Sequence, residues 1–170
     1  PAVLPRPEWQ LECDAVRARF EGAAVLVTGA AGSVGSALTA ALLALGCRRV
    51  VAVDSHEPSL FHLRQRLAAT AESNRLRLAL GDVRDTGRMR RLLAEESPSV
   101  VLHLAAYKHV PIGEENVDQV IGVNLVGTAR LLSLCAECGV SDFVYPSTDK
   151  AVNPPSTYGA TKRTVERMLL

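Results

Sequence analysis

The sequence has 170 residues, of which 48% are hydrophobic and 22% charged, and its formal net charge is +1. This is the composition of one globular domain with its own core. The near-neutral balance excludes the basic footprint of a nucleic-acid-binding protein, so no nucleic-acid partner is expected. The longest apolar stretch, 37–46, is about half a membrane span, so no crossing segment is predicted. No secretory signal is visible and the first residue is Pro1, so we expect a piece of a longer protein.

Apolar runs and amphipathic segments alternate along the chain. The expected strands are 23–27, 48–54, 76–82, 98–106 and 142–147, and the expected helices are 33–46, 60–71, 84–96, 118–139 and 156–170. Strands buried on both faces and separated by such helices build parallel βαβ units. Right-handed crossovers then predict an α/β fold, a doubly wound parallel sheet of the Rossmann type, over residues 23–170. Residues 1–22 form an appendage, with an amphipathic helix over 8–20 that packs on one edge or face of the sheet.

The segment TGAAGSVG (28–35) follows the first strand and opens the next helix. Gly29, Gly32 and Gly35 are spaced three apart, and Asp54 ends the second strand nineteen residues after Gly35. This context is typical of the dinucleotide fingerprint, in which glycines allow a tight turn and the pyrophosphate sits on the helix N-terminus. The sequence therefore predicts an NAD or NADP site, with a purely structural turn as the alternative.

Carboxylates at two strand ends bear on the choice of cofactor. Asp54 is expected to accept hydrogen bonds from the adenosine ribose, which favours NAD because a carboxylate repels a 2′-phosphate. Arg64 or Arg66, one helix later, would compensate for NADP, and this choice stays open. Asp82 ends the third strand, where it either reaches the adenine amino group or caps the next helix.

Tyr158 and Lys162 form a YxxxK motif, four residues apart on one face of the last helix. A tyrosine hydroxyl has a pKa near 10, and a nearby cation favours the tyrosinate, so this pair is suited to act as a base. Ser147 or Thr148 follows the fifth strand, at the end of the sheet where doubly wound folds bind ligands, and is expected to hydrogen-bond the same substrate oxygen. A surface pair without function is the alternative.

The cysteines and two histidines have ordinary structural interpretations. Cys135 and Cys138 share a helix face, but no second CxxC or histidine pair completes a zinc set, so we expect buried or half-buried thiols, no metal and a reducing compartment. His103 and His109 either contact a ligand or are hydrogen-bonded structural residues, and the structural role is the favoured one.

With these residues in place, the chain resembles the Rossmann portion of the extended short-chain dehydrogenases/reductases. The segments LAAYKHVP (104–111), VNLVGT (123–128) and STDKAVNP…YGATKR (147–163) are similar to the nucleotide-sugar 4,6-dehydratases of the polysaccharide-biosynthesis type, which serve capsule formation and flagellin glycosylation. The SxDKA block is the most specific of them. Residues 8–29 resemble the entry segment of membrane-linked members.

The resemblance implies conversion of a UDP-N-acetylhexosamine-like nucleotide sugar to a 4-keto-6-deoxy sugar. Tyr158, helped by Lys162 and Thr148, would take the C4 hydroxyl proton; Lys150 would remove the C5 proton, and Asp149 would protonate the departing C6 hydroxyl. Lys150 beside Asp149 should lower the pKa of the aspartate, which opposes its role as an acid. Burial and the charge on Lys162 should favour a neutral Lys150.

The remaining expectations also come from the resemblance. Asn124 matches a helix asparagine that helps organise the lysine as a structural or proton-relay residue. Relatives continue beyond residue 170 with the substrate-binding lobe, which implies a chain truncated before that lobe and inactive as it stands. We expect a homo-oligomer in the cytoplasm, at the membrane's cytoplasmic face in a membrane-linked parent. The candidate cofactor-binding residues are Gly29, Gly32, Ser33, Val34, Gly35, Asp54, Asp82, Val83, Ala105, Ala106 and Lys162.

Two other functions compete with the dehydratase. A nucleotide-sugar 4-epimerase shares the first hydride step but needs no pair such as Asp149–Lys150 after the fifth strand. A non-catalytic dinucleotide-binding module needs neither Tyr158 nor Lys162. The presence of both pairs favours the dehydratase.

Overall fold

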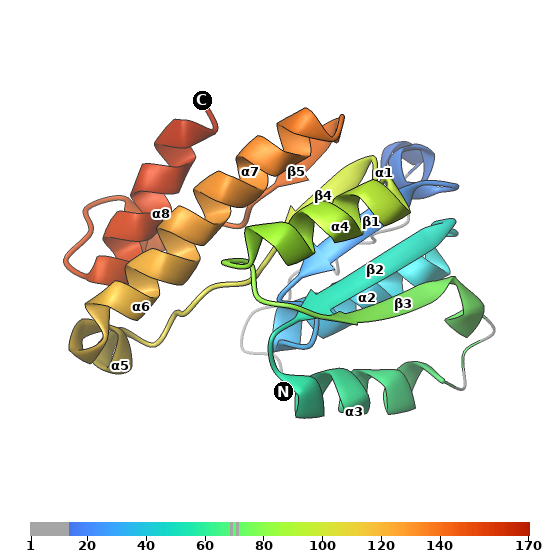
Figure 1. Ribbon diagram of the computed structural model, residues 1–170, viewed down its shortest axis with the longest axis horizontal. Coiled ribbons are helices and arrows are strands. Elements are labelled where there is room, and N and C mark those ends of the chain that lie inside the picture. Colours follow the sequence, from blue (N-terminus) through green and yellow to red (C-terminus); the bar gives the residue numbers. More distant parts are fainter. Residues whose placement is uncertain (1–13, 69, 71) are drawn as a thin grey trace, which may run out of the picture.

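The computed structural model describes residues 14–68, 70 and 72–170, which form a parallel five-stranded sheet between layers of helices (Figure 1). The strands are β1 (Ala24–Thr28), β2 (Arg49–Asp54), β3 (Leu76–Leu80), β4 (Val100–His103) and β5 (Asp142–Val144), and their order across the sheet is β3-β2-β1-β4-β5. In the centre, Val25 of β1 pairs with Val50 of β2 and Val100 of β4. The predicted doubly wound α/β fold is confirmed.

Helices cover both faces of this sheet. The α-helices of the described residues are α1 (Asp14–Phe20), α2 (Ser33–Ala44), α3 (Glu57–Leu67), α4 (Thr86–Glu96), α5 (Val110–Glu115), α6 (Val117–Ile121), α7 (Thr128–Glu137) and α8 (Thr157–Met168). Leu42 of α2 and Leu63 of α3 pack on one face, whereas Met89 of α4 and Leu131 of α7 pack on the other (Figure 1). This two-sided burial explains why the strands read as continuous apolar runs.

Several elements begin or end elsewhere than the sequence predicts. Helix α3 starts at Glu57 because His56 caps it, with Nδ1 accepting from the Ser59 amide, and because Pro58 suits a first turn. Strand β4 ends at His103, so residues 104–106 belong to a loop. Strand β5 has only three residues, which pair with the first three of β4. The loops after these strands are therefore longer than expected, and they supply residues to the site described below.

The predicted helix over 118–139 is present but changes its pitch. Residues Gly122–Gly127, between α6 and α7, form a π-helical segment. Such segments hold one extra residue per turn and often occur at functional sites. The whole helix, Val117–Glu137, is long and apolar enough to span a membrane by length and composition, although the sequence predicts no crossing segment. Apolar residues of this helix belong to the core of the domain, since Leu131 and Leu134 are buried against the sheet.

The described part of the predicted appendage is α1; residues 8–13 lie outside the described residues. Arg19 of α1 pairs with Asp142 at the start of β5, and Phe20 packs against the core beside α2. The Gly22 amide donates to the Gly46 carbonyl, just before β2. Helix α1 therefore lies at the amino ends of the strands, away from the glycine turn.

Candidate functional site

A cavity of about 680 Å³ lies at the carboxyl ends of β1 to β4. Every predicted cofactor-binding residue except Lys162 lines it: Gly29, Gly32, Ser33, Val34, Gly35, Asp54, Asp82, Val83, Ala105 and Ala106. Tyr107, Lys108 and His109 extend its wall along the loop after β4. The strand order reverses between β1 and β4, and doubly wound folds bind ligands at this switch point.

The glycine turn is closely packed on both sides. Gly29 has a φ of +64°, and a Cβ atom there would lie 2.7 Å from the Ala105 amide nitrogen. A Cβ atom on Gly35 would meet the Gly29 carbonyl oxygen. Side chains are therefore excluded at both positions, and the turn brings bare backbone to the cavity wall.

The amino end of α2 carries unsatisfied donors. Gly32 is the N-cap residue and offers no side-chain cap. Within the described residues, the amides of Ser33, Val34 and Gly35 have no acceptor, whereas the Ser36 amide donates to the Gly32 carbonyl. Free amides at a helix N-terminus, together with the helix dipole, form an anion-binding site. Because these residues line the cavity, a diphosphate fits this end of it.

Asp54 is held in a fixed orientation beside the glycine turn. Its Oδ2 accepts from the Ala31 amide at 2.9 Å and its Oδ1 from the His56 amide at 3.0 Å. Neither candidate cation faces this carboxylate from the cavity wall. Arg64 lines a second cavity, of about 400 Å³, elsewhere on the domain, and Arg66 donates to the Ser36 hydroxyl at 3.4 Å.

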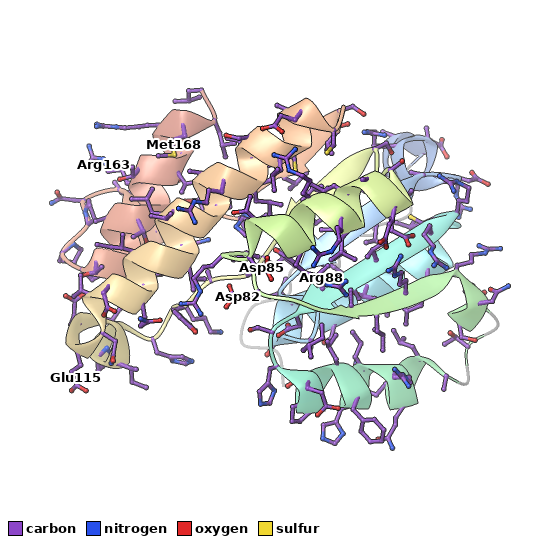
Figure 2. All side chains as sticks on the ribbon, in the orientation of Figure 1. Asp82, Asp85, Arg88, Glu115, Arg163 and Met168 are labelled. Carbon is purple, nitrogen blue, oxygen red and sulfur yellow. The ribbon has the colours of Figure 1, made fainter. Side chains whose placement is uncertain are left out.

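Asp82 lies in the turn after β3, close to Asp85 (Figure 2). It forms an ion pair with Arg84. The guanidinium binds both carboxylate oxygens at 2.7–3.1 Å, and this hydrogen bonding holds the pKa of Asp82 below its usual range. Arg84 also donates to Gln119 of α6 at 2.8 Å. The alternative that Asp82 caps α4 is wrong, because Asp85 caps it by accepting from the Arg88 amide at 2.8 Å.

Lys162 of the YxxxK motif is almost completely buried, with 3% of its surface exposed. Its ammonium donates to the Pro146 carbonyl at 2.8 Å and lies 4.0 Å from the centre of the Tyr145 ring. Burial lowers the pKa of Lys162 to about 8, and the charge of Glu166 partly opposes this. Tyr158, one turn earlier on α8, is half-buried.

The Thr148–Asp149–Lys150 segment follows β5 and ends in a 3₁₀ turn, Asp149–Ala151. The Thr148 hydroxyl donates to Asp149 Oδ1 at 2.9 Å, and Lys150 Nζ lies 3.5 Å from the same oxygen. The Thr148 hydrogen bond and then the charge of Lys150 hold the pKa of Asp149 below its usual range, the direction expected from the sequence. The expected burial of Lys150 is wrong, because half of its side-chain surface is exposed.

Asn124 is fully buried in the π-helical segment and binds the loop after β4. Its side chain accepts from the Tyr107 amide and donates to the Tyr107 carbonyl, both at 2.8 Å. It also donates to the Thr161 hydroxyl at 3.4 Å. Within the described residues it makes no hydrogen bond to Lys162, so its direct contacts stabilise the loop.

His103 is a buried structural residue. Thr128 donates its hydroxyl proton to the Asn124 carbonyl, so His103 Nε2 donates to Thr128 at 2.8 Å and Nδ1 accepts from Thr28 at 2.6 Å. Burial, and then the charge of Lys162, lowers the pKa of His103 to about 3, so the ring is neutral. His109, in contrast, is exposed and lines the cavity.

Two residues of this region were not singled out from the sequence. Glu166 accepts from the Ser147 hydroxyl and continues the face of Tyr158 and Lys162 by another four residues. The four-residue spacing from Lys162 could have indicated from the sequence that Glu166 lies on this face. Tyr145 lies under Lys162, and no pattern in the sequence indicates this contact. The cysteines agree with their structural interpretation, since Cys47 and Cys135 are buried and Cys138 half-buried.

The fold and the glycine turn together define a Rossmann-type domain of the dehydrogenase/reductase class. Residues 25–170 match the family described as "Polysaccharide biosynthesis protein", and the chain belongs to that family. The resemblance inferred from the sequence motifs is thereby confirmed.

Similar proteins include enzymes that act on nucleotide sugars. The chain is 37% identical to an uncharacterized membrane protein of Methanocaldococcus jannaschii and 35% identical to a UDP-N-acetylglucosamine 4,6-dehydratase (inverting) of Campylobacter jejuni; in each case the match covers 89% of this chain and 44% of the relative. A UDP-glucose 4-epimerase of Stenotrophomonas maltophila, solved with NAD and formylated UDP-arabinopyranose, is 30% identical with a TM-score of 0.75. That match covers 86% of this chain and 47% of the epimerase, so the chain spans less than half of each of these proteins.

Proposed function

We propose that this chain is the cofactor-binding and catalytic part of an NAD-dependent nucleotide-sugar 4,6-dehydratase in polysaccharide biosynthesis. The observation that carries the proposal is that two features follow the carboxyl ends of strands in the same parallel sheet. One is the cavity at the α2 N-terminus; the other is the Asp149–Lys150 pair in the segment after β5, which does not itself line that cavity. The similarity to the C. jejuni dehydratase supports the same function.

The cavity suits a dinucleotide in shape and in charge. The free amides of Ser33, Val34 and Gly35 would hold the pyrophosphate, and Asp54 would accept from the adenosine ribose. We favour NAD over NADP because Asp54 is negative and neither Arg64 nor Arg66 lines the cavity. When bound, the nicotinamide would supply the acceptor for a hydride that leaves C4 of the sugar and, later, the donor of the hydride that is added to C6.

The residues around the ends of β5 and α8 would move the protons. Tyr158 would remove the C4 hydroxyl proton, with Lys162 one turn later on the same helix and the Thr148 hydroxyl binding the same oxygen. The resulting ketone acidifies the C5 proton, which Lys150 would remove. Asp149 would protonate the C6 hydroxyl as it leaves, so that water departs. A proton delivered to C5, which the protonated Lys150 can supply, would accompany the return of hydride to C6 and complete the 4-keto-6-deoxy sugar.

Asp149 must be protonated to act on the C6 hydroxyl, but its surroundings in the structure favour the ionised carboxylate. The Thr148 hydroxyl and the Lys150 ammonium both stabilise the carboxylate. A sugar bound over this exposed turn would exclude water and engage the Thr148 hydroxyl, and both changes raise the pKa of Asp149. Substrate binding is therefore part of the proposed acid catalysis.

The test is to incubate the full product of the gene that encodes this chain with UDP-N-acetylglucosamine and follow the product mass. We expect loss of one water without net reduction of NAD, and loss of turnover in Asp149→Asn and Lys150→Met. Glu115→Gln, an exposed change at the end of α5, is the matched control (Figure 2). An unchanged mass with an altered sugar configuration would identify a 4-epimerase. NAD binding without any product from a panel of nucleotide sugars would identify a binding module.

The cellular setting belongs to the same proposal. We place the domain in the cytoplasm, because a reducing compartment keeps thiols such as Cys47 and Cys135 free. The similarity to a membrane protein of M. jannaschii supports attachment of the parent protein to a membrane. Self-association of the domain is expected from the resemblance alone and is tested by sedimentation.

A further inference from the structure

Tyr145 contacts both a buried neutral ring and a buried cation. One face of its ring stacks on His103, with centroids 5.8 Å apart and planes inclined by 25°. The Lys162 ammonium lies 4.0 Å from the centre of the same ring. The three side chains come from β4, the end of β5 and α8, so this stack joins the sheet to the helix that carries the YxxxK motif.

The hydroxyl of Tyr145 does not explain why a tyrosine stands here. Its oxygen is buried and has no hydrogen-bond partner within the described residues, which is uncommon for a buried hydroxyl. The contacts that the residue makes with the site are those of its ring. An ammonium within about 6 Å of an aromatic centroid is attracted by the negative face of the ring, and more strongly where water is excluded.

Lys162 needs such a contact because little else stabilises its charge. Among the described residues the lysine makes one hydrogen bond, to the Pro146 carbonyl, and its burial favours the neutral amine. The ionisable groups around it are Glu166 on its own helix, Tyr145 after β5 and His103 of β4, which Tyr145 also contacts. Tyr158 lies one turn earlier on the same helix. His103 is neutral, so it does not repel the ammonium strongly.

We propose that Tyr145 is a positioning residue for Lys162: its ring face holds the ammonium beside α8 and keeps the lysine charged in a buried place. The benefit of this for catalysis rests on the proposed function, in which Tyr158, one turn before Lys162 on the same helix, removes the C4 hydroxyl proton. The contact itself does not rest on that function.

Lysine NMR tests the contact directly, because the whole sequence has lysine only at positions 108, 150 and 162. The 170-residue chain is labelled with ¹³C-lysine, the three signals are assigned with lysine-to-arginine variants, and each is titrated without nucleotide. In the unsubstituted chain we expect a Lys162 midpoint at about 8. Tyr145→Phe keeps the ring and should keep the midpoint. Tyr145→Leu should lower it by about half to one and a half pH units.

The matched control is Phe143→Leu. Phe143 lies on β5, two residues before Tyr145, and packs on the same histidine, with centroids 5.7 Å apart. Among the described residues the Lys162 ammonium lies over the Tyr145 ring and not over that of Phe143. We expect this variant to leave the Lys162 midpoint in place. A midpoint that rises in Tyr145→Leu would overturn the proposal, because the tyrosine would then only exclude water. An unchanged midpoint, or an equal fall in Phe143→Leu, would overturn it as well.

Fluorinated phenylalanines at position 145 give a second test that preserves the shape of the core. Fluorine withdraws electron density from the ring face and weakens its attraction for a cation without removing the ring. The Lys162 midpoint should fall stepwise from phenylalanine to difluoro- and pentafluorophenylalanine, and a flat series would contradict the proposal. Because no nucleotide or sugar is present, failure here leaves the dehydratase proposal standing, and the product-mass experiment decides that separately.

Discussion

A Cβ atom on Gly35 would lie 2.1 Å from the carbonyl oxygen of Gly29. The first turn of α2 therefore rests directly on the backbone of the preceding turn. This contact sets where the helix begins, and with it the direction of the free amides that face the cavity.

Gly35→Ala should lower the free energy of unfolding by about 1–3 kcal/mol, because the backbone must shift to admit the methyl group. The same shift should weaken NAD binding about tenfold or more by moving the amides of Ser33 and Val34. Urea unfolding and NAD titration measure the two effects. Gly87→Ala in α4 is the control, since its Cβ would meet the nearest atom at an ordinary 3.5 Å. Equal effects of both alanines would contradict the close contact.

Asp54→Asn should reduce the discrimination between NAD and NADP. The amide keeps one acceptor but loses the charge, so NAD should bind about tenfold more weakly while NADP loses its repulsion. The ratio of the two dissociation constants is the measurement. Glu57→Gln removes the same charge from an exposed position that does not line the cavity, and it should leave the ratio unchanged. A ratio unaltered by Asp54→Asn would remove Asp54 from the ribose site.

Asn124→Leu should release the loop after β4. The leucine leaves the Tyr107 amide and carbonyl without their partner, at a cost of about 2–4 kcal/mol. Hydrogen exchange should accelerate most in residues 104–109, which uniform destabilisation would not single out. Thr164→Ala, which removes a local hydrogen bond on an exposed part of α8, is the control. Unchanged exchange in this loop would contradict the assigned contact.

His103 should make the free energy of unfolding depend on pH. Its pKa is about 3 in the folded protein, against about 6.5 when unfolded, so the unfolded chain binds the proton first as the pH falls. Its contribution is therefore complete above about pH 6.5 and declines below it, by up to about 1.4 kcal/mol per pH unit.

The measurement for His103 is urea unfolding at about pH 7 and pH 5, where its titration should remove about 2 kcal/mol. His103→Gln keeps a donor and an acceptor for Thr28 and Thr128 but does not titrate, so its stability should fall less between these two conditions. His62→Gln, on the exposed side of α3, should behave like the parent chain. An equal acid loss in all three proteins would exclude His103 as its source.

Local patterns predicted the parts of this domain that local chemistry decides. The apolar runs, the glycine turn and Asp54 at the end of β2 are each evident within one βαβ unit, and each expected strand is present, although β4 and β5 end earlier than expected. Asp82 shows the limit of this approach. Two carboxylates, Asp82 and Asp85, precede α4, and only the backbone path through the turn decides which of them caps it.

Contacts between distant segments could not be predicted in the same way. The Tyr145–Lys162 contact depends on how α8 packs against the end of β5, and the role of Asn124 depends on where the loop after β4 passes. The π-helical segment has no sequence signature of its own here.

That segment separates two tasks within a single helix. Asn124 and Leu131 are seven residues apart, so in an undistorted α-helix they would point the same way. The extra residue in the π turn rotates them apart: Asn124 turns to the loop and α8, while Leu131 enters the core beneath the sheet. The phase of the helix thus changes at the boundary between core and site. A one-residue deletion between 122 and 127 would restore regular α-helical pitch, so Asn124 and Leu131 could not both keep their contacts. The length of this stretch is therefore as constrained as its composition.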